Sequence, residues 1–358
     1  MADVEPVIVG IGMMTSVGLS AQETAASVRA GVTRHTESAL CDKSFEPFIL
    51  ARVLEDGMPP LTDEVDALPG LAHREVRMLR LATRPLIEAM GAADTSAPVP
   101  LMLALPATET TRPLDPYAFL KNLGMQTEGI IDEDKSTLIT DGRAGGLLAV
   151  GKAAELIQSG QSTICLAGGV DSYMPPYILG QLDQEGRIQS ANTLDGFIPG
   201  EGAGFILLAD RAAAERAGLQ PLATIFAPAS GLEEGHIYSD AAYQGEGLAG
   251  AMTEFLEQRN GRPPIAEVYS SMNGENHWAK EWGVSYLRNS SSFTEEYGMR
   301  HPADCFGDTG AACGPLMIAL ATVGINAGYR QSPCLVYCSS DRGTRSVLEV
   351  SSLEEQES

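Results

Sequence analysis

The chain has 358 residues, 44% of them hydrophobic and 20% charged, and its 24 Lys and Arg against 47 Asp and Glu give a net charge of −23. This composition excludes a wholly disordered chain, and the length allows two domains or one large one. The negative charge argues against nucleic acid or an anionic membrane as a partner, because both need a positive surface. No apolar stretch of about 20 residues occurs, so we expect no transmembrane helix. No basic segment precedes the first short apolar run, which predicts a cytoplasmic protein without a secretory signal.

The six cysteines and five histidines indicate neither a disulfide framework nor a metal centre. No CxxC pair is present, and most cysteines lie in apolar strings such as 163–167, which favours reduced, buried thiols. The histidines lie far apart, with no HxxxH or HExxH spacing. We therefore predict no metal and no cofactor.

In chain order, the first predicted unit is a strand, a glycine turn and a helix. The β-branched run 7–9 ends in Gly10-Ile11-Gly12, and a helix-like stretch covers 20–29. This order is typical of the start of an α/β protein. The glycine pair also fits a dinucleotide-binding loop, but Thr15 stands where the third glycine is needed, so a Rossmann fold is disfavoured.

The next predicted element is a helix over 72–92, broken or kinked near Pro85. Its Arg77, Arg80 and Arg84 fall at i, i+3 and i+7 and therefore share one face. Such a stripe is solvated, pairs with acids or docks an anion, and the sequence leaves these alternatives open.

The sequence also predicts one more strand and two exposed segments. A buried strand is predicted over 101–105, and 132–135 forms a charged, exposed stretch. The acidic tail 353–358 is expected to fray.

Two segments in different halves of the chain share one pattern. Residues 146–160 and 314–328 are each a mostly apolar helix bounded by glycines fourteen positions apart, and each leads into a buried strand. Small and apolar residues on all sides of both helices indicate that they pack on several sides. The two copies predict a duplicated α/β architecture whose halves pack together, and they are too few for a solenoid.

Glycine-rich segments surround these two helices in a fixed order. They lie at 140–146, 167–172, 195–204 and 306–314. Together with the opening segment 9–18, they resemble the β-ketoacyl-(acyl carrier protein) synthases of the thiolase superfamily. The strongest match is Asp-Gly-Phe-Ile-Pro-Gly-Glu-Gly-Ala-Gly, which begins at Asp195.

The resemblance implies an α/β fold of the thiolase type, a duplicated five-layer α-β-α-β-α sandwich that is usually dimeric. It extends from about Val7 to Val350, in a chain shorter than typical members. We expect an N-terminal half over 1–209 and a C-terminal half over 210–358, packed as one compact unit.

The sequence departs from the family at its catalytic positions. Family enzymes carry a cysteine at the start of the buried helix and two histidines in later loops, and the matching positions here hold Arg143, Asn273 and Asp308. Arginine stays protonated and cannot act as an acyl-accepting nucleophile. Asn273 can still donate a hydrogen bond, whereas Asp308 only accepts and would repel a malonyl carboxylate. The resemblance therefore implies that the Cys-His-His triad is lost and that decarboxylative condensation is disfavoured.

An unbalanced guanidinium at a helix N-terminus opposes the helix dipole and destabilises the fold when it is buried. We therefore predict that Arg143 pairs with a carboxylate, with Glu275 and Asp308 as equal candidates. The groups near this position that could support other chemistry are Glu275, His277 and Cys313, together with Asp308, and a lone His or Cys is more often structural.

Two functions follow from these residues. The first is a catalytically inactive ketosynthase-like protein that acts as a binding or scaffold partner, similar to a chain-length factor or to an adaptor or chaperone in fatty acid or polyketide biosynthesis. The second is an enzyme with altered acyl-transfer or hydrolytic chemistry on a thioester. The expected partner is a second copy, a ketosynthase-like protein or another client. Acyl carrier protein is disfavoured, because it is acidic like this chain.

Overall fold

The computed structural model describes residues 4–91, 93, 97–108, 112, 114–259 and 261–353, so the acidic tail lies outside it from residue 354 on. Ten strands form one sheet in the order β10-β9-β11-β12-β8-β1-β7-β6-β4-β5. Their bounds are β1 (Pro6–Thr15), β4 (Val99–Ala104), β5 (Ile131–Ile139), β6 (Ile164–Ser172), β7 (Glu201–Asp210), β8 (Ala223–Leu232), β9 (Ile265–Ser270), β10 (Phe293–Arg300), β11 (Cys334–Ser339) and β12 (Thr344–Ser351).

The sheet consists of two sets of five strands with the same topology. Counted along the chain within each set, both run in the order 3-2-4-5-1. In both sets the first two of these contacts are parallel and the last two antiparallel. The sets join where Val7 and Ile8 of β1 pair with Thr224 and Ala223 of β8. The predicted duplication is therefore confirmed, whereas the boundary between 209 and 210 remains a prediction.

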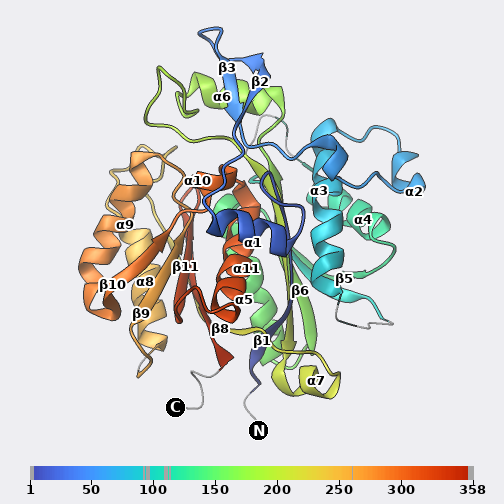
Figure 1. The fold of residues 1–358 in the computed structure, drawn as a ribbon, viewed down its shortest axis with the longest axis vertical. Helices are drawn as coiled ribbons and strands as arrows, with labels where there is room; N and C mark the ends of the chain where they lie inside the picture. Colours follow the sequence, from blue (N-terminus) through green and yellow to red (C-terminus); the bar gives the residue numbers. More distant parts are fainter. Residues whose placement is uncertain are drawn as a thin grey trace.

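The helices form three layers that alternate with the two halves of the sheet (Figure 1). The central layer is α5 (Gly145–Gln158) and α11 (Cys313–Asn326), and the outer layers are α3 (His73–Met90) with α4 (Pro116–Gln126) and α8 (Glu246–Gln258) with α9 (Asn276–Asn289). The smaller helices are α1 (Ala21–Arg29), α2 (Asp63–Asp66), α6 (Pro176–Gln184), α7 (Arg211–Arg216) and α10 (Ala303–Phe306). This is the expected five-layer α-β-α-β-α arrangement.

The largest hydrophobic core surrounds the two central helices and takes residues from both halves of the sheet. The helices approach each other at glycines. A Cβ on Gly146 would lie 2.3 Å from Cδ of Pro315, and one on Gly314 would lie 2.9 Å from the amide nitrogen of Leu147. The prediction that both helices pack on several sides is confirmed.

The structure corrects the reading of the first glycines and of the proline. The strand β1 continues to Thr15, so Gly10 and Gly12 lie inside it and form no turn. A Cβ on Gly10 would meet the carbonyl oxygen of Ala89 at 2.0 Å, and one on Gly12 would meet that of Pro85 at 1.9 Å. These glycines let α3 lie close against the strand, and α3 itself runs unbroken through the proline.

The arginines of α3 have different environments, although they share a helix face. Arg77 is buried and pairs with Glu201 and Glu55, whereas Arg80 pairs with Glu55. Arg84 is exposed. Of the three alternatives, pairing with acids is confirmed for Arg77 and Arg80.

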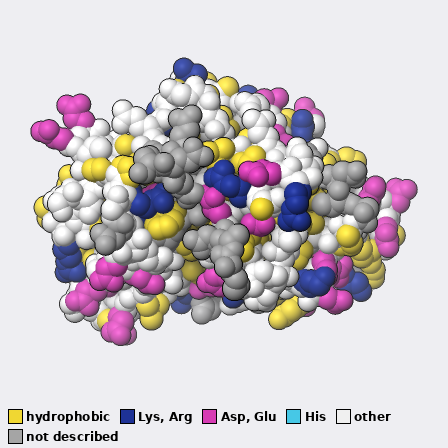
Figure 2. Space-filling view, turned by 90° about the horizontal axis from the view of Figure 1, so that it is seen from below, with side chains coloured by type: hydrophobic (Ala, Val, Ile, Leu, Met, Phe, Trp, Pro, Cys, Tyr) yellow, Lys and Arg dark blue, Asp and Glu magenta, His cyan; other side chains and the backbone are white. Residues whose placement is uncertain are grey.

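A cap covers one end of the sandwich, and both termini emerge near the other (Figure 1). The cap combines α6 with a hairpin of β2 (Thr36–Cys41) and β3 (Pro47–Leu50). Figure 2 shows the face at the terminal end, where acidic side chains are scattered and basic ones occur singly or in small groups. Among the described residues, no helix is both long and apolar enough to cross a membrane. All six cysteines are free, and four of them are buried as expected, whereas Cys313 is partly buried and Cys41 is exposed.

Candidate functional site

The turn that leads into the buried helix α5 places Arg143 in the interior. It is a short 3-10 turn, Gly142–Ala144, and its first residue has φ +60°, which favours glycine. Arg143 is only 3% exposed. The backbone amide of Ala144 donates to Oγ of Ser340 at 2.9 Å, so a side chain from the other half of the molecule caps the start of the helix.

The guanidinium of Arg143 is surrounded by acceptors. Its Nε donates to the carbonyl oxygen of Ser339 at 3.0 Å, and its two terminal nitrogens pair with Asp308 and Asp341. Its central carbon lies 4.5 Å from the ring centroid of Trp278, a cation–π contact. Burial alone would lower the pKa of Arg143, but the carboxylates raise it above its usual value. The predicted pairing with a carboxylate is confirmed for Asp308, whereas Asp341 was not predicted.

The three positions matched to the family triad lie together. Asn273 donates through Nδ2 to Oδ2 of Asp308 at 2.8 Å, the carboxylate that also pairs with Arg143. The other oxygen of Asp308 accepts from the amide of Gly310 at 2.9 Å. The arrangement is a closed set of donors and acceptors centred on Asp308.

Glu275, the second candidate partner of Arg143, instead pairs with Arg187. Nε and Nη2 of Arg187 donate to the two carboxylate oxygens at 2.7 and 2.9 Å. Arg187 also reaches Oδ2 of Asp341 at 2.8 Å, so Asp341 bridges two buried arginines. Burial alone would raise the pKa of Asp341, but Arg143 and Arg187 lower it to about 2.

Sequence reasoning missed Arg187 and Asp341. Arg187 lies 154 positions before Asp341 and 88 before Glu275, and it belongs to no recognisable motif. The one available signal is that two acids, Glu275 and Asp308, were candidates for the single cation Arg143. One of them therefore needed a second cation, which is Arg187.

His277 and Cys313 form no constellation with Glu275. The ring of His277 lies between Tyr243 and Trp278, each at a centroid distance of 4.7 Å, and its Nε2 has no hydrogen-bond partner among the described residues. Burial lowers the pKa of His277, and the positive charge of Arg345 lowers it further. Glu275 and His277 line a common recess, but Cys313 is not among its lining residues.

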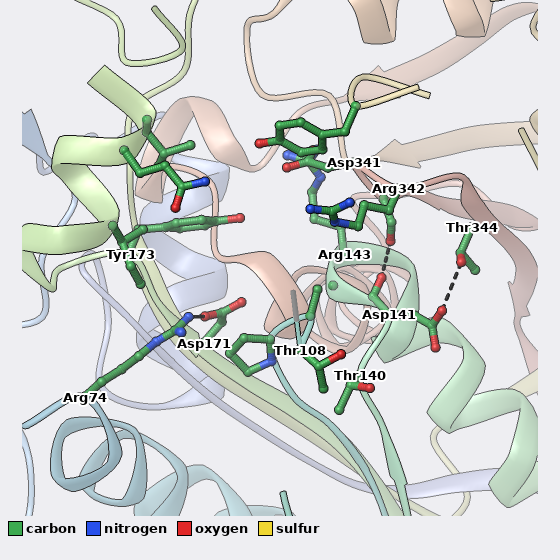
Figure 3. A pocket seen from close by; sticks show the side chains of 18 residues that line it. Arg74, Thr108, Thr140, Asp141, Arg143, Asp171, Tyr173, Asp341, Arg342 and Thr344 are labelled. Atoms are coloured by element: carbon green, nitrogen blue, oxygen red, sulfur yellow. Dashed lines mark hydrogen bonds and ion pairs between the residues drawn. The ribbon is translucent and has the colours of Figure 1, made fainter. Parts of the chain in front are cut away.

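A cavity of about 360 Å³ lies on the other side of Arg143 (Figure 3). Its walls come from the turn before α5, the start of α3, the end of β6 and the cap helix α6. The ring of Tyr173 points across it toward Arg143. Burial raises the pKa of Tyr173 well above its usual value, and the carboxylate of Asp308 adds to this effect, so the phenol stays protonated.

Within the part of the chain that the structure describes, no three His, Cys, Asp or Glu side chains are grouped to hold a metal ion. The site therefore offers a fixed network of ion pairs on one side and a polar cavity on the other.

Comparison with solved structures identifies the fold. The chain superposes on a structure described as "The ishigamide ketosynthase/chain length factor" with a TM-score of 0.76, covering 98% of this chain and 100% of that one at 14% identity. A ketosynthase from module 6 of the bacillaene synthase of Bacillus subtilis 168 gives 0.77, with 98% and 72% coverage and 12% identity. The fold is therefore the thiolase-like α/β fold of ketosynthases.

Sequence comparison adds a family relationship over part of the chain. Residues 137–214 match the family described as "Beta-ketoacyl synthase, N-terminal domain". An alignment 114 positions long, which covers 27% of this chain and 28% of the relative, shows 35% identity to the Streptomyces coelicolor "Actinorhodin polyketide putative beta-ketoacyl synthase 2". The match thus spans under a third of this relative's length. These findings relate the chain to the beta-ketoacyl synthase family.

Proposed function

We propose that this protein is a catalytically inactive ketosynthase-like protein that acts by binding another protein. The observation that carries the proposal is Arg143, a guanidinium enclosed by carboxylates at the start of the buried helix α5. A permanently protonated group provides no lone pair for acyl transfer. Asp308 and Asn273, at the positions matched to the histidines, already have hydrogen-bond partners: Asp308 accepts from Asn273, Arg143 and Gly310, and Asn273 accepts from the amide of Glu275.

An altered enzyme has less support from the same geometry. Burial alone would raise the pKa of Glu275, but Arg187 lowers it, which makes this carboxylate a weak base. His277 contacts aromatic rings, and the thiol of Cys313 interacts with Cys338. Among Glu275, His277 and Cys313, no nucleophile is hydrogen-bonded to a base in the way that covalent catalysis needs.

The proposed partner is a ketosynthase-like protein, either a second copy or a different chain. One structural relative is described as a ketosynthase with a chain length factor, which supports pairing between chains of this fold. A carrier protein is disfavoured as the direct partner, because the net charge of −23 repels an acidic protein on average. We place this function in the cytoplasm.

The test has two arms. Purified protein is incubated with malonyl- and acyl-thioesters, and covalent acylation, carbon dioxide and free acid are measured. Co-expression with intact ketosynthases of the same genome, followed by native mass spectrometry, then tests for a one-to-one complex. We expect no turnover and a stable complex. Turnover that is lost in Asp308→Asn or His277→Ala would overturn the proposal.

A further inference from the structure

The turn of the cap hairpin carries the most exposed large apolar side chain among the described residues. Phe45 lies between β2 and β3 and is 89% exposed. Figure 1 shows this turn projecting beyond α6, at the end of the molecule opposite the termini. Phe48 and Leu50 of β3 are instead buried in the cap core with α6. The hairpin therefore has apolar residues for its own packing, and Phe45 is not one of them.

The backbone of Phe45 is also unusual. Its φ is +66°, in the left-handed region, where a bulky side chain is rare because its Cβ comes too close to the following carbonyl oxygen. Glu128 is the one other described residue besides glycines with a positive φ. A ring that is almost fully exposed makes too few contacts inside the chain to offset this strain.

Hydrogen bonds hold the turn in this conformation. The amide of Phe45 donates to the carbonyl oxygen of Asp42 at 3.0 Å, and Oδ1 of Asp42 accepts from two further amides of the turn at 2.7 and 2.9 Å. Lys43 fixes the turn on α6, since its amide donates to Oδ2 of Asp183 at 2.9 Å and its Nζ to the carbonyl oxygen of Asp183 at 2.6 Å. The ring is thus presented by a fixed backbone, which lowers the entropy lost on binding.

A single exposed apolar side chain is common and needs no function. Leu287 is an example, because it is 79% exposed but lies within the regular helix α9. Phe45 differs, since glycine would adopt the same backbone without strain and without exposing a ring. Strained residues occur preferentially at functional sites, and buried aromatic side chains dominate the energy of protein interfaces. A partner that buries the ring accounts for both unfavourable features.

The charge around the ring indicates which partner fits. The hairpin contains three acids and one base, which are Glu37, Asp42, Glu46 and Lys43. The ammonium of Lys43 already donates to α6. A second copy would bring the same acids, on a chain of net charge −23, and like charges repel across an interface. The complementary surface is an apolar pocket with Lys and Arg at its rim.

We propose that Phe45 is the anchor through which this protein binds a different chain, a ketosynthase-like partner with an apolar pocket rimmed by Lys and Arg. The assignment rests on the proposed function and narrows its partner, which there is either a second copy or a different chain.

The first test uses the complex with a co-expressed intact ketosynthase of the same genome, with affinity measured by calorimetry. Phe45→Gly should weaken the complex about thirtyfold, which corresponds to about 2 kcal/mol. Phe45→Tyr keeps the ring and should bind like the wild type. Glu46→Lys reverses one rim charge and should weaken binding about fivefold at low salt. Leu287→Ser is the matched control, an equally exposed apolar side chain on α9, and should leave the affinity unchanged.

The second test uses the isolated chain and needs no partner. Phe45→Gly should raise the midpoint of thermal unfolding by about 1 °C, because glycine removes the backbone strain. A lower midpoint would show that the ring stabilises the fold, and it would overturn the assignment of Phe45. A complex whose affinity Phe45→Gly leaves unchanged would also overturn it, while the proposed function would stand. Absence of a complex with every ketosynthase would overturn both.

Discussion

The two central helices begin in the same way, yet the turn before one contains a buried arginine and the turn before the other contains an alanine at the same position. Both are 14 residues long and follow a 3-10 turn whose first residue is a left-handed glycine, Gly142 with φ +60° and Gly310 with φ +52°. The second residue of the turn is Arg143 in the first half and Ala311 in the second. Both are almost completely buried.

The surroundings explain the difference. Arg143 faces the loop after β11, which supplies the carbonyl of Ser339 and the carboxylate of Asp341. Ala311 belongs to the hydrophobic core. The packing around it is tight, since a Cβ added to Gly169 would lie only 2.2 Å from the carbonyl oxygen of Ala311. The turn before α5 can thus hold a buried guanidinium, because the loop after β11 in the C-terminal half supplies its acceptors.

The largest effect is expected when an arginine is placed at Ala311, the position in the second half that corresponds to Arg143. Ala311→Arg would overfill a packed core, and the nearby carboxylate of Asp171 already accepts from the amide of Ala311 and from Arg74. We expect no soluble folded protein, measured by soluble yield and circular dichroism. Ala311→Gly is the control and should remain soluble. A folded Ala311→Arg variant would show that the second half has acceptors or space that the structure does not indicate.

The reverse change makes the first half resemble the second. Arg143→Ala leaves Asp308 and Asp341 without this cation, and removing one partner of a buried ion pair typically costs about 3–5 kcal/mol. Urea unfolding should show a loss of this size. The double variant Arg143→Ala/Asp308→Asn should recover part of it, because one uncompensated charge is removed. Arg84→Ala, an exposed change, should cost under about 0.5 kcal/mol, and a similar small loss in Arg143→Ala would contradict the role given to the network.

The glycines that open the two turns sharpen the comparison. A Cβ on Gly310 would lie 2.1 Å from Oδ2 of Asp171, whereas one on Gly142 would meet nothing closer than Oγ of Ser340 at 3.7 Å. Gly142→Ala therefore introduces only backbone strain, about 1–2 kcal/mol. Gly310→Ala adds a clash with a buried, hydrogen-bonded carboxylate, and we expect about 3 kcal/mol in urea unfolding. Equal losses in the two variants would contradict this difference.

The sequence was sufficient to predict the duplicated architecture, because two apolar helices with the same glycine spacing occur at corresponding places in the halves. It also predicted that Arg143 pairs with a carboxylate, but it left Asp308 and Glu275 as equal candidates, and only the structure selects Asp308. Gly10 and Gly12 were misread, because glycine spacing alone does not distinguish a turn from a strand against which a helix packs closely.

The rest of the site depends on contacts that leave no local pattern. Arg187 comes from a loop before the strand β7, and Asp341 comes from a loop between the last two strands. Their ion pair joins residues 154 positions apart. Only the folded arrangement of both halves brings them together, so neither spacing nor composition could identify them.

Asp341, which links the two arginines, gives the smallest expected effect and one that depends on pH. The pKa of Asp341 is about 2 in the folded protein, where burial raises it but Arg143 and Arg187 lower it further, and about 3.9 in an unfolded chain. Its contribution to the free energy of unfolding, about 2 kcal/mol at pH 7, is therefore present above pH 4 and is lost as the pH falls toward 2. The difference between the wild type and Asp341→Asn in urea unfolding should follow this course. The two proteins are compared because burial raises the pKa of Asp171. Its effect on the free energy of unfolding changes with pH in the opposite direction, is the same in both proteins and cancels in the difference. A difference that stays constant between pH 7 and pH 2 would show that the carboxylate of Asp341 is not held by the two arginines in solution.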